Sequence, residues 1–434
     1  MTNVCPHCFN DESLKKRITE IRPDFPDEKC TFHPRYKGIP ISAVAEIVDA
    51  VFRHQYGWGE YYSYSNEQAG DPLDSLVEEM TLADDYEIAK ALADQLIEDD
   101  DYWPSDGGEA FYADDQNYVR YDYSYLHHST LWENFCRSIV HSQRFFNASA
   151  RELIAEIFDG IHFQRDHQRR SPIYEVKPGG EGASFFRARI ADGETKREQI
   201  TGAPGEELGP PPERLRRAGR MNPAGIGCFY AAYDFPTCIA ELRPAVGSTV
   251  VGAEFELIRP IYVLDTTRFQ EPMKPLSVFA KHYMTRVEQW SFMQRFCREI
   301  AKPVSRHYEH LDYIPTQAVA EYFLHHHNFK RSGKPAKIEA IIFQSAQLPQ
   351  GRNIVLLGDA AQVQRPKQSR KKPPKSAIGE FFPEPFETFL DSLPTARNPA
   401  LKVVESSVEV RRVTGAHYDS EDGFVPTFDD DLDF

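Results

Sequence analysis

The chain has 434 residues, of which 41% are hydrophobic, 12% aromatic and 27% charged, a composition typical of a folded protein with two or three domains. Its formal net charge of -16 argues against non-specific nucleic-acid binding, because phosphate backbones attract basic surfaces. The longest uncharged apolar runs, such as "NIVLLG", are far shorter than a membrane span, so we expect no membrane insertion.

Cysteine usage points to metal ligation. The chain has seven cysteines, an odd number, and its first residues lack the basic and apolar pattern of a secretory leader. These features favour reduced thiols over a disulfide framework. We therefore expect a cytoplasmic protein.

Residues 1–38 are predicted to form a small zinc-binding segment. They contain Cys5, Cys8, Cys30 and His33, arranged as C-x2-C, a spacer of 21 residues and C-x2-H. Each pair can ligate one ion from a tight turn, and thiolates with an imidazole suit tetrahedral zinc. Four protein ligands leave no open coordination position, so the pattern predicts a structural role.

Residues 39–168 are predicted to form an acidic and mostly helical domain. Apolar residues recur at helical spacing in 41–54, 84–100 and 147–158. Between these helices the aromatic and polar stretch 102–128 shows no clear period. We predict that this stretch is irregular.

From about residue 184 the pattern changes to short strands separated by Gly- and Pro-rich loops. The predicted strands are "SFFRARI", "GCFYAAYD", "STVVGAEFEL", "PIYVLD", "IEAIIFQS" and "NIVLLG". Helices are predicted near 285–301 and from about 316 to 324. Because strands and helices do not alternate regularly, the sequence predicts an α+β fold and not a doubly wound parallel sheet. Residues 361–434 are predicted to be a basic linker, "QVQRPKQSRKKPPKS", and an acidic carboxy-terminal extension.

Five motifs then occur in a fixed order: "FFRAR", "GRMNPAG", "FYAAYDFPTCIAE", "YIPTQAVAEYF" and "IIFQSAQLPQGRNIVLL". Together they resemble the RES domain, a family named for its Arg, Glu and Ser, and we assign residues 169–360 to it. The resemblance implies a mixed sheet like that of ADP-ribosyltransferases. It also implies a toxin of a toxin-antitoxin pair that breaks the nicotinamide-ribose bond of NAD+. The preceding helical region, with its CxxC start, resembles a HEPN-like domain found fused to some RES domains.

The resemblance also implies which residues form the site. It assigns the family's catalytic positions to Arg187, Tyr230, Glu241 and Ser345. It assigns substrate binding to Arg220, Asn222, Thr316 and Gln317. This chain departs from the family at Met221, where a Trp or Phe is common.

The residue types agree with that chemistry. Cleavage of an N-glycosidic bond passes through an oxocarbenium-like ribosyl cation, which the carboxylate of Glu241 can stabilise. Arg187 and Arg220 offer planar forks that match pyrophosphate oxygens. Tyr230 can stack on nicotinamide, and Ser345 can donate to the carboxamide or to a ribose oxygen. Taken singly, each residue type more often has a structural role, such as a solvated face, a core tyrosine or a cap.

The sequence is also compatible with other activities. The same site can transfer ADP-ribose to a macromolecule, and water or phosphate are the other acceptors, giving a glycohydrolase or a phosphorylase. Arg120 and His127 have the R-x6-H spacing of HEPN ribonucleases, which would make the second domain an inactive scaffold. NAD+ is expected as a substrate, because neither a dinucleotide-binding glycine motif nor a P-loop is present. The resemblance further implies control by an antitoxin or regulatory protein, and it leaves open assembly into a homo-oligomer.

Overall fold

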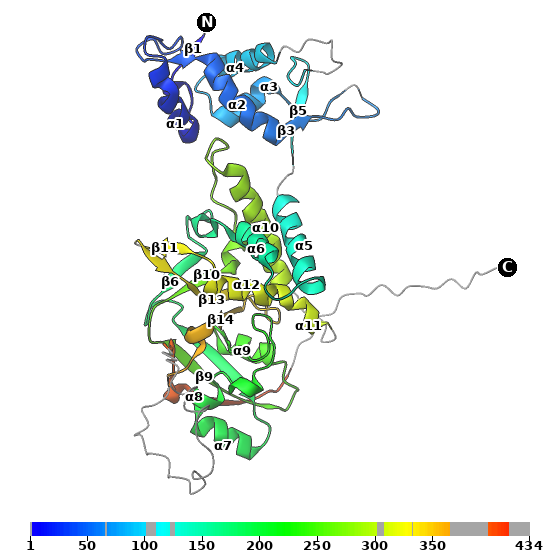
Figure 1. The fold of residues 1–434 in the computed structure, drawn as a ribbon, viewed down its shortest axis with the longest axis vertical. Helices are drawn as coiled ribbons and strands as arrows, with labels where there is room; N and C mark the ends of the chain where they lie inside the picture. The colour runs from blue at the N-terminus through cyan, green and yellow to red at the C-terminus, as the bar shows by residue number, and fades with distance from the viewer. Residues whose placement is uncertain are drawn as a thin grey trace, which may run out of the picture. The chain divides into compact units, whose positions relative to one another are not determined.

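The computed structural model describes residues 2–65, 67–100, 110–121, 126–301, 308–331, 333–364 and 398–415 (Figure 1). The chain divides into two units. The amino-terminal unit comprises Met1–Phe135, Ala155–Ser171 and Phe269–Phe296. The sheet unit comprises Cys136–Ile154, Pro172–Arg268 and Cys297–Phe434. Within the described residues, every helix is too short or too polar to span a bilayer.

The first part of the amino-terminal unit is built from four helices around one core. They are α1 (Glu12–Ile21), α2 (Ile41–Gln55), α3 (Leu73–Thr81) and α4 (Tyr86–Asp99). The apolar residues of α2 recur every three or four positions, and Val44, Val48 and Phe52 are fully buried. Strands β1 (Asn3–Val4) and β2 (Ile39–Pro40) pair antiparallel. The predicted helices over 41–54 and 84–100 are therefore confirmed as α2 and α4.

A second small sheet corrects one sequence-based expectation. Strand β5 (Asn117–Arg120) lies between β3 (Tyr56–Trp58) and β4 (Asp71–Pro72), inside the stretch 102–128 that we predicted to be irregular. Its pairing partners are more than 40 residues away, so the strand leaves no local periodic signal. Residues 101–109 and 122–125 of that stretch lie outside the described residues.

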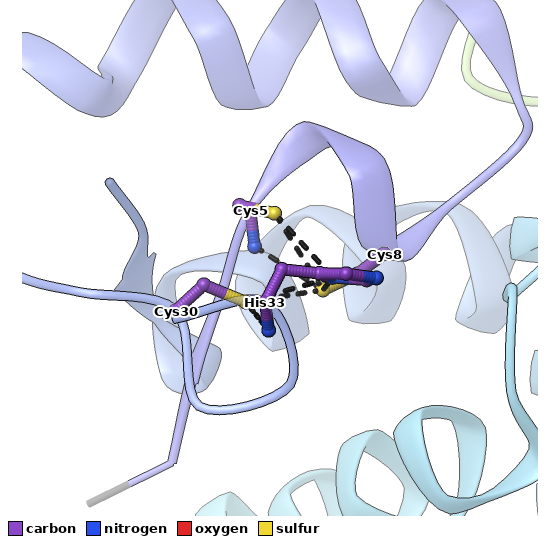
Figure 2. A group of neighbouring side chains, drawn as sticks. All are labelled: Cys5, Cys8, Cys30 and His33. Atoms are coloured by element: carbon purple, nitrogen blue, oxygen red, sulfur yellow. Dashed lines mark hydrogen bonds between the residues drawn. The ribbon is translucent and has the colours of Figure 1, made fainter. Parts of the chain in front are cut away.

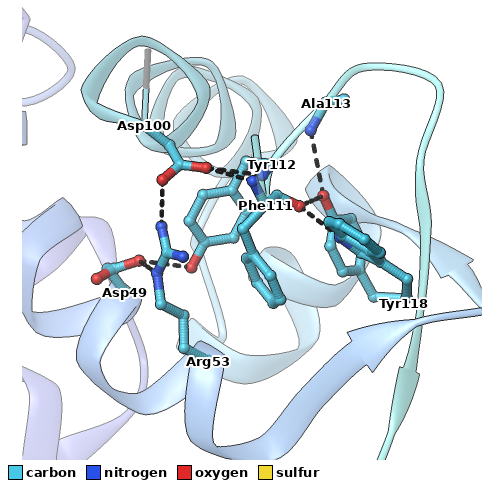
Figure 3. Close-up of polar contacts among 8 residues, drawn as sticks. Asp49, Arg53, Asp100, Phe111, Tyr112, Ala113 and Tyr118 are labelled. Carbon is cyan, nitrogen blue, oxygen red and sulfur yellow. Dashed lines mark hydrogen bonds and ion pairs between the residues drawn. The ribbon is translucent and has the colours of Figure 1, made fainter. Parts of the chain in front are cut away.

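A polar network joins α2, the end of α4 and the segment before β5 (Figure 3). The Arg53 guanidinium donates to Asp49 Oδ1 at 2.6 Å and to Asp100 Oδ1 at 2.5 Å. The other oxygen of Asp100 accepts the backbone N–H groups of Phe111 and Tyr112 at 2.6 and 3.0 Å. The network thus ties the end of α4 and the segment before β5 to α2.

Three further helices contribute residues to both units. They are α5 (Leu126–His141), α6 (Ala148–Phe158) and α10 (Tyr283–Ala301). The predictions of helices over 147–158 and near 285–301 are confirmed by α6 and α10.

The sheet unit contains a sheet of nine described strands, ordered β15-β9-β7-β8-β14-β13-β10-β6, with β16 also paired to β9. The strands are β6 (Ile173–Val176), β7 (Ser184–Ile190), β8 (Phe229–Ala232), β9 (Thr249–Leu257), β10 (Ile261–Asp265), β13 (Ile338–Gln344), β14 (Arg352–Leu356), β15 (Leu401–Val403) and β16 (Glu409–Arg412). Strands β10 and β13 are parallel, and the other described pairs of this sheet are antiparallel. The sheet is therefore mixed, which confirms the predicted α+β fold and all six predicted strands.

The remaining elements of the sheet unit are short. A hairpin is formed by β11 (Phe329–Arg331) and β12 (Lys334–Ala336). The helices are α7 (Glu194–Gly202), α8 (Pro204–Glu207), α9 (Phe235–Leu242), α11 (Glu309–Asp312) and α12 (Ile314–His325). The helix predicted from about 316 to 324 is confirmed as α12.

The carboxy-terminal region completes one sheet edge. Strand β15 pairs with the end of β9, and β16 pairs with its beginning. Both come from the region 361–434, which we predicted to be a linker and extension. They cover backbone groups that an edge strand would otherwise expose. Most of the basic run and all of the acidic tail lie outside the described residues, in 365–397 and 416–434.

Helix α9 is seated on the sheet by a cap and by two glycines. Asp234 caps its first turn, because Oδ1 accepts the N–H of Thr237 at 2.7 Å and Oδ2 accepts its hydroxyl at 2.8 Å. A Cβ at Gly252 on β9 would lie 2.5 Å from the Phe235 ring. A Cβ at Gly351 would lie 2.5 Å from Thr237 Oγ1. The absence of side chains at these two positions lets α9 approach the sheet closely.

We expect Gly351→Ala to destabilise the protein by about 1–3 kcal/mol, because Thr237 is held by Asp234 and the whole helix has to shift. The free energy of unfolding in urea measures this. Gly202→Ala at the end of α7 is the control, because a Cβ there meets nothing within 4 Å. Equal unfolding free energies for Gly351→Ala and the wild type would contradict this account of the contact.

Candidate functional site

Glu241 lies in the last turn of α9 and is exposed. The helix ends at Leu242 and is followed by Arg243, which has a left-handed φ of 45°, and by Pro244. The carboxyl end of a helix carries partial negative charge, so a carboxylate there is disfavoured by about 0.3–1 kcal/mol. Hydrogen-bond donors therefore offset a small penalty on the Glu241 carboxylate in this position.

Two side chains from neighbouring strands supply those donors. Ser345, directly after β13, donates its hydroxyl to Glu241 Oε1 at 2.5 Å. Asn353 on β14 donates its Nδ2 to the same oxygen at 2.7 Å. The exposed fractions of Ser345 and Asn353 are only 5% and 6%. An exposed carboxylate is thus held from beneath by two buried donors 104 and 112 residues further along the chain.

The Ser345 hydroxyl has one direction in which it can donate. Its oxygen accepts the backbone N–H groups of Gln347 and Leu348, both at 3.1 Å. A hydroxyl has two acceptor positions and one hydrogen, so the hydrogen is left for Glu241. The sequence suggested that Ser345 donates to substrate, whereas in the structure its hydrogen is directed at the carboxylate.

Arg187 lies where the sheet nearly parts. Strands β7 and β8 share a single residue pair, Phe186 with Ala232. Beside that pair, Arg187 Nη1 donates to the carbonyl of Tyr230 at 3.0 Å, and its guanidinium stacks on Phe229 at 4.7 Å. The Arg187 side chain thus donates to the carbonyl of Tyr230, which in a continuous β-ladder would accept a backbone N–H of the neighbouring strand.

The charges of Arg187 and Glu241 both affect the pKa of Cys238 on α9. Strand alternation places Arg187 on the face opposite α9, yet the charges of both Arg187 and Glu241 act on the Cys238 thiol of that helix. Burial raises the pKa of Cys238 to about 12, an effect that Arg187 opposes and Glu241 reinforces. Burial and the like charge of Arg189 lower the pKa of Arg187 to about 10, so it stays protonated at neutral pH. Arg189 instead donates to the Gly209 carbonyl at 3.2 Å.

Tyr230 connects Arg187 to the loop before β8. Its hydroxyl donates to Asn222 Oδ1 at 2.8 Å and accepts the N–H of Met221 at 2.9 Å. Asn222 Nδ2 donates to the carbonyl of Ile226 at 2.9 Å and approaches those of Arg217 and Pro223. Asn222, predicted to bind substrate, is thus buried and organises the turn.

Helix α12 holds the same loop from the other side. Thr316 donates its hydroxyl to the carbonyl of Arg220 at 2.5 Å, and Gln317 Nε2 donates to that of Gly219 at 2.8 Å. The Arg220 guanidinium lies 5.6 Å from the centre of the Tyr313 ring. In the structure, Thr316 and Gln317 therefore fix the backbone that carries Arg220.

The predicted residues thus form two groups in the sheet unit. Glu241 and Ser345 are in direct contact, and the other predicted residues meet around the loop 219–226. Asn353 joins the first group and was missed by the sequence analysis. Its only sequence signal was its place at the start of the strand in "GRNIVLL", two positions after Gly351.

The residues of the ribonuclease interpretation have separate partners. Arg120 donates to Tyr283 at 2.7 Å and to Gln55 at 3.3 Å. His127 lies 3.0 Å from Glu156. These contacts tie Arg120 and His127 to different helices, and the described residues show no shared site for the pair.

Cys5, Cys8, Cys30 and His33 meet in the amino-terminal unit, as predicted (Figure 2). Their ligand atoms all lie within 4.8 Å of one another, and the neighbouring sulfur and nitrogen atoms are 3.4–3.9 Å apart. A tetrahedral zinc ion with bonds of about 2.3 Å to sulfur requires edges of about 3.8 Å. This cluster can therefore hold a zinc ion.

The surroundings of the cluster also fit a cation. Burial raises the pKa of the Cys5 and Cys8 thiols, so thiolates there need a compensating positive charge. Backbone N–H groups already point at two of the sulfurs, from Cys5 to Cys8 and from His33 to Cys30. A carboxylate oxygen of Asp84 lies 3.9 Å from His33 Nε2, the imidazole nitrogen that faces away from the cysteines.

A family model described as RES domain matches residues 186–374. Neither a curated protein nor a solved structure matches the chain. The match confirms the resemblance that the five motifs indicated. It does not extend to the residues before 186, where the HEPN-like resemblance remains a prediction.

The environment of Tyr230 predicts a pH dependence of stability. Burial raises the pKa of its phenol above the ordinary value of about 10. The unfolded state then loses its proton first, so this contribution is intact below pH 10 and is lost as the pH rises above it. We expect the free energy of unfolding of the wild type to fall between pH 10 and 11. In Tyr230→Phe its slope should be shallower by up to about 1.4 kcal/mol per pH unit. Identical slopes would show that the phenol is ionised equally in both states.

Proposed function

We propose that this chain, which carries a RES domain over residues 186–374, cleaves the nicotinamide-ribose bond of NAD+. The observation that carries the proposal is the hydrogen bond between Ser345 and Glu241, the serine and the acid of the family motif. These residues are 104 positions apart, and the fold brings them into contact at 2.5 Å. Their partner Asn353 anchors the same carboxylate.

The proposed chemistry depends on the charge of Glu241. As nicotinamide leaves, positive charge develops on the ribose, and a fixed carboxylate stabilises it more strongly than it stabilises the neutral ribose. Because Glu241 is exposed while its donors are buried, a substrate can approach the carboxylate without displacing Ser345 or Asn353. A prepositioned charge needs little reorganisation during the reaction.

Arg187 and Arg220 suit the pyrophosphate of NAD+ by their charge and shape. Arg187 is protonated at neutral pH, and the loop carrying Arg220 is held by Tyr230 and α12. Guanidinium groups bind phosphate oxygens in a planar fork, so we assign the pyrophosphate to these two arginines. Tyr230 then serves mainly to connect them, because its carbonyl accepts from Arg187 and its hydroxyl holds the loop.

The biological role that we propose is that of a toxin or defence effector controlled by a partner protein, because uncontrolled NAD+ loss harms the host cell. Water, phosphate or a macromolecule would accept the ADP-ribose. Labelled NAD+ separates these outcomes. Free ADP-ribose indicates hydrolysis, a phosphorylated ADP-ribose that appears only with added phosphate indicates phosphorolysis, and label on a macromolecule indicates transfer.

We also propose that the Cys3His cluster holds a structural zinc. The four residues complete a tetrahedron and leave no position for substrate. Zinc would cross-link the segment that follows strand β1 to the segment Cys30–His33.

The catalytic proposal predicts that Glu241→Gln lowers kcat for NAD+ by about 100- to 1000-fold. Glutamine keeps the size of the side chain and an oxygen for Ser345 and Asn353, but it removes the negative charge. Chromatography of NAD+ and nicotinamide measures the turnover. Glu254→Gln on β9 is a matched control, because Glu254 also accepts a serine hydroxyl, that of Ser184, outside the proposed site. Wild-type turnover in folded Glu241→Gln protein would refute the assignment.

The zinc proposal predicts about one zinc per chain in protein purified without chelator. Cys8→Ser should lose the metal and lower the thermal midpoint, because metal binding and local folding are coupled. Cys136→Ser, outside the cluster, should retain both. Elemental analysis that finds no zinc in the wild type would rule out the site.

A further inference from the structure

We infer that Asn353 is a positioning residue that, with Ser345, fixes the rotation of the Glu241 carboxylate and leaves Oε2 as the oxygen that faces the ribose. This inference rests on the proposed NAD+-cleaving function and deepens it. Its basis is the pair of hydrogen bonds to a single oxygen of Glu241.

The two oxygens of the Glu241 carboxylate differ in how many hydrogen bonds they accept. Each oxygen of a carboxylate has about two acceptor positions, so the donors from Ser345 and Asn353 saturate Oε1. Within the described part of the chain, Oε2 of Glu241 receives no hydrogen bond. The donors therefore divide the carboxylate into an anchored oxygen and an available one.

In the hydrogen bond between Asn353 and Glu241, the asparagine is the donor. Amide nitrogen and oxygen can be confused in structures, but a carboxylate only accepts, so the Asn353 atom that faces Glu241 is the NH2 group. Asn353 is buried, and water does not readily replace its donor. Its backbone lies between β8 and β13, paired with Ala232 and Phe343, which fixes the origin of the side chain.

The second donor restricts the rotation of the Glu241 carboxylate, which one donor alone would allow. A single hydrogen bond from Ser345 would let the carboxylate rotate about the contact, and Oε2 would sweep an arc. The second bond, from a different strand, removes that freedom. A displacement of about 1 Å at a reacting centre can cost about 100-fold in rate. Loss of Asn353 should therefore slow the chemical step and leave NAD+ binding largely intact, because the arginines that we assign to the pyrophosphate lie elsewhere.

The test measures kcat and KM for NAD+ in Asn353→Ala and in Asn353→Asp. Asparagine and aspartate have the same shape, so Asn353→Asp keeps the packing and replaces the donor by an acceptor. We expect kcat to fall about 10- to 100-fold in both variants, with KM changed less than about threefold. Thr266→Val, which removes another buried hydrogen bond of this sheet unit, should leave both constants unchanged.

A double-mutant cycle separates positioning from a general structural effect. If Asn353 acts through Glu241, Asn353→Ala should lower the residual rate of Glu241→Gln by less than about threefold. An equal loss in the two backgrounds would overturn the inference, and so would an unchanged kcat in Asn353→Ala. In both cases the proposed function would stand, because the wild type turns over NAD+ and Glu241→Gln does so far more slowly. A wild type with no turnover would instead refute the proposed function, and the inference with it.

Discussion

The anchoring of one exposed carboxylate determines how the candidate site is built. Glu241 sits at the carboxyl end of α9, where the helix dipole disfavours negative charge, and it depends on donors from two strands. Those donors reach it because α9 lies directly against the sheet, a position that requires glycine at 252 and 351. The negative charge is therefore maintained by packing that extends well beyond the glutamate itself.

The small number of residue pairs between β7 and β8 determines the environment of Arg187. With one residue pair between the two strands, a backbone carbonyl is available to Arg187, and the guanidinium occupies the space that a ladder would fill. Tyr230 then couples Arg187 to the loop of Arg220, which α12 clamps. Most of the polar residues that the RES motifs single out thus hydrogen-bond to other parts of the sheet unit.

Both units bury an apolar core, and the amino-terminal unit also contains the Cys3His cluster. The sheet unit buries a large apolar core between its strands and helices, and the carboxy-terminal strands close the edge of β9. At its start, the amino-terminal unit gathers buried thiols whose ionisation is disfavoured without a cation. A metal ion bound there would compensate these thiolates and cross-link the segment that carries Cys5 and Cys8 to the one that carries Cys30 and His33.

The sequence by itself determined the α+β class, six of the nine described strands of the sheet and the Cys3His cluster, because hydrophobic periodicity and ligand spacing are local signals. Through the order of its motifs it also placed Glu241 and Ser345 in one family site. It did not reveal β5, whose partners are distant, or Asn353, an asparagine that looks like any other at the start of a strand. Only the tertiary structure decided that Ser345 points at Glu241 and that Asn222, Thr316 and Gln317 hold a loop. Hydrogen-bond partners far apart in the chain are chosen by how the strands and helices pack, and no local pattern records that choice.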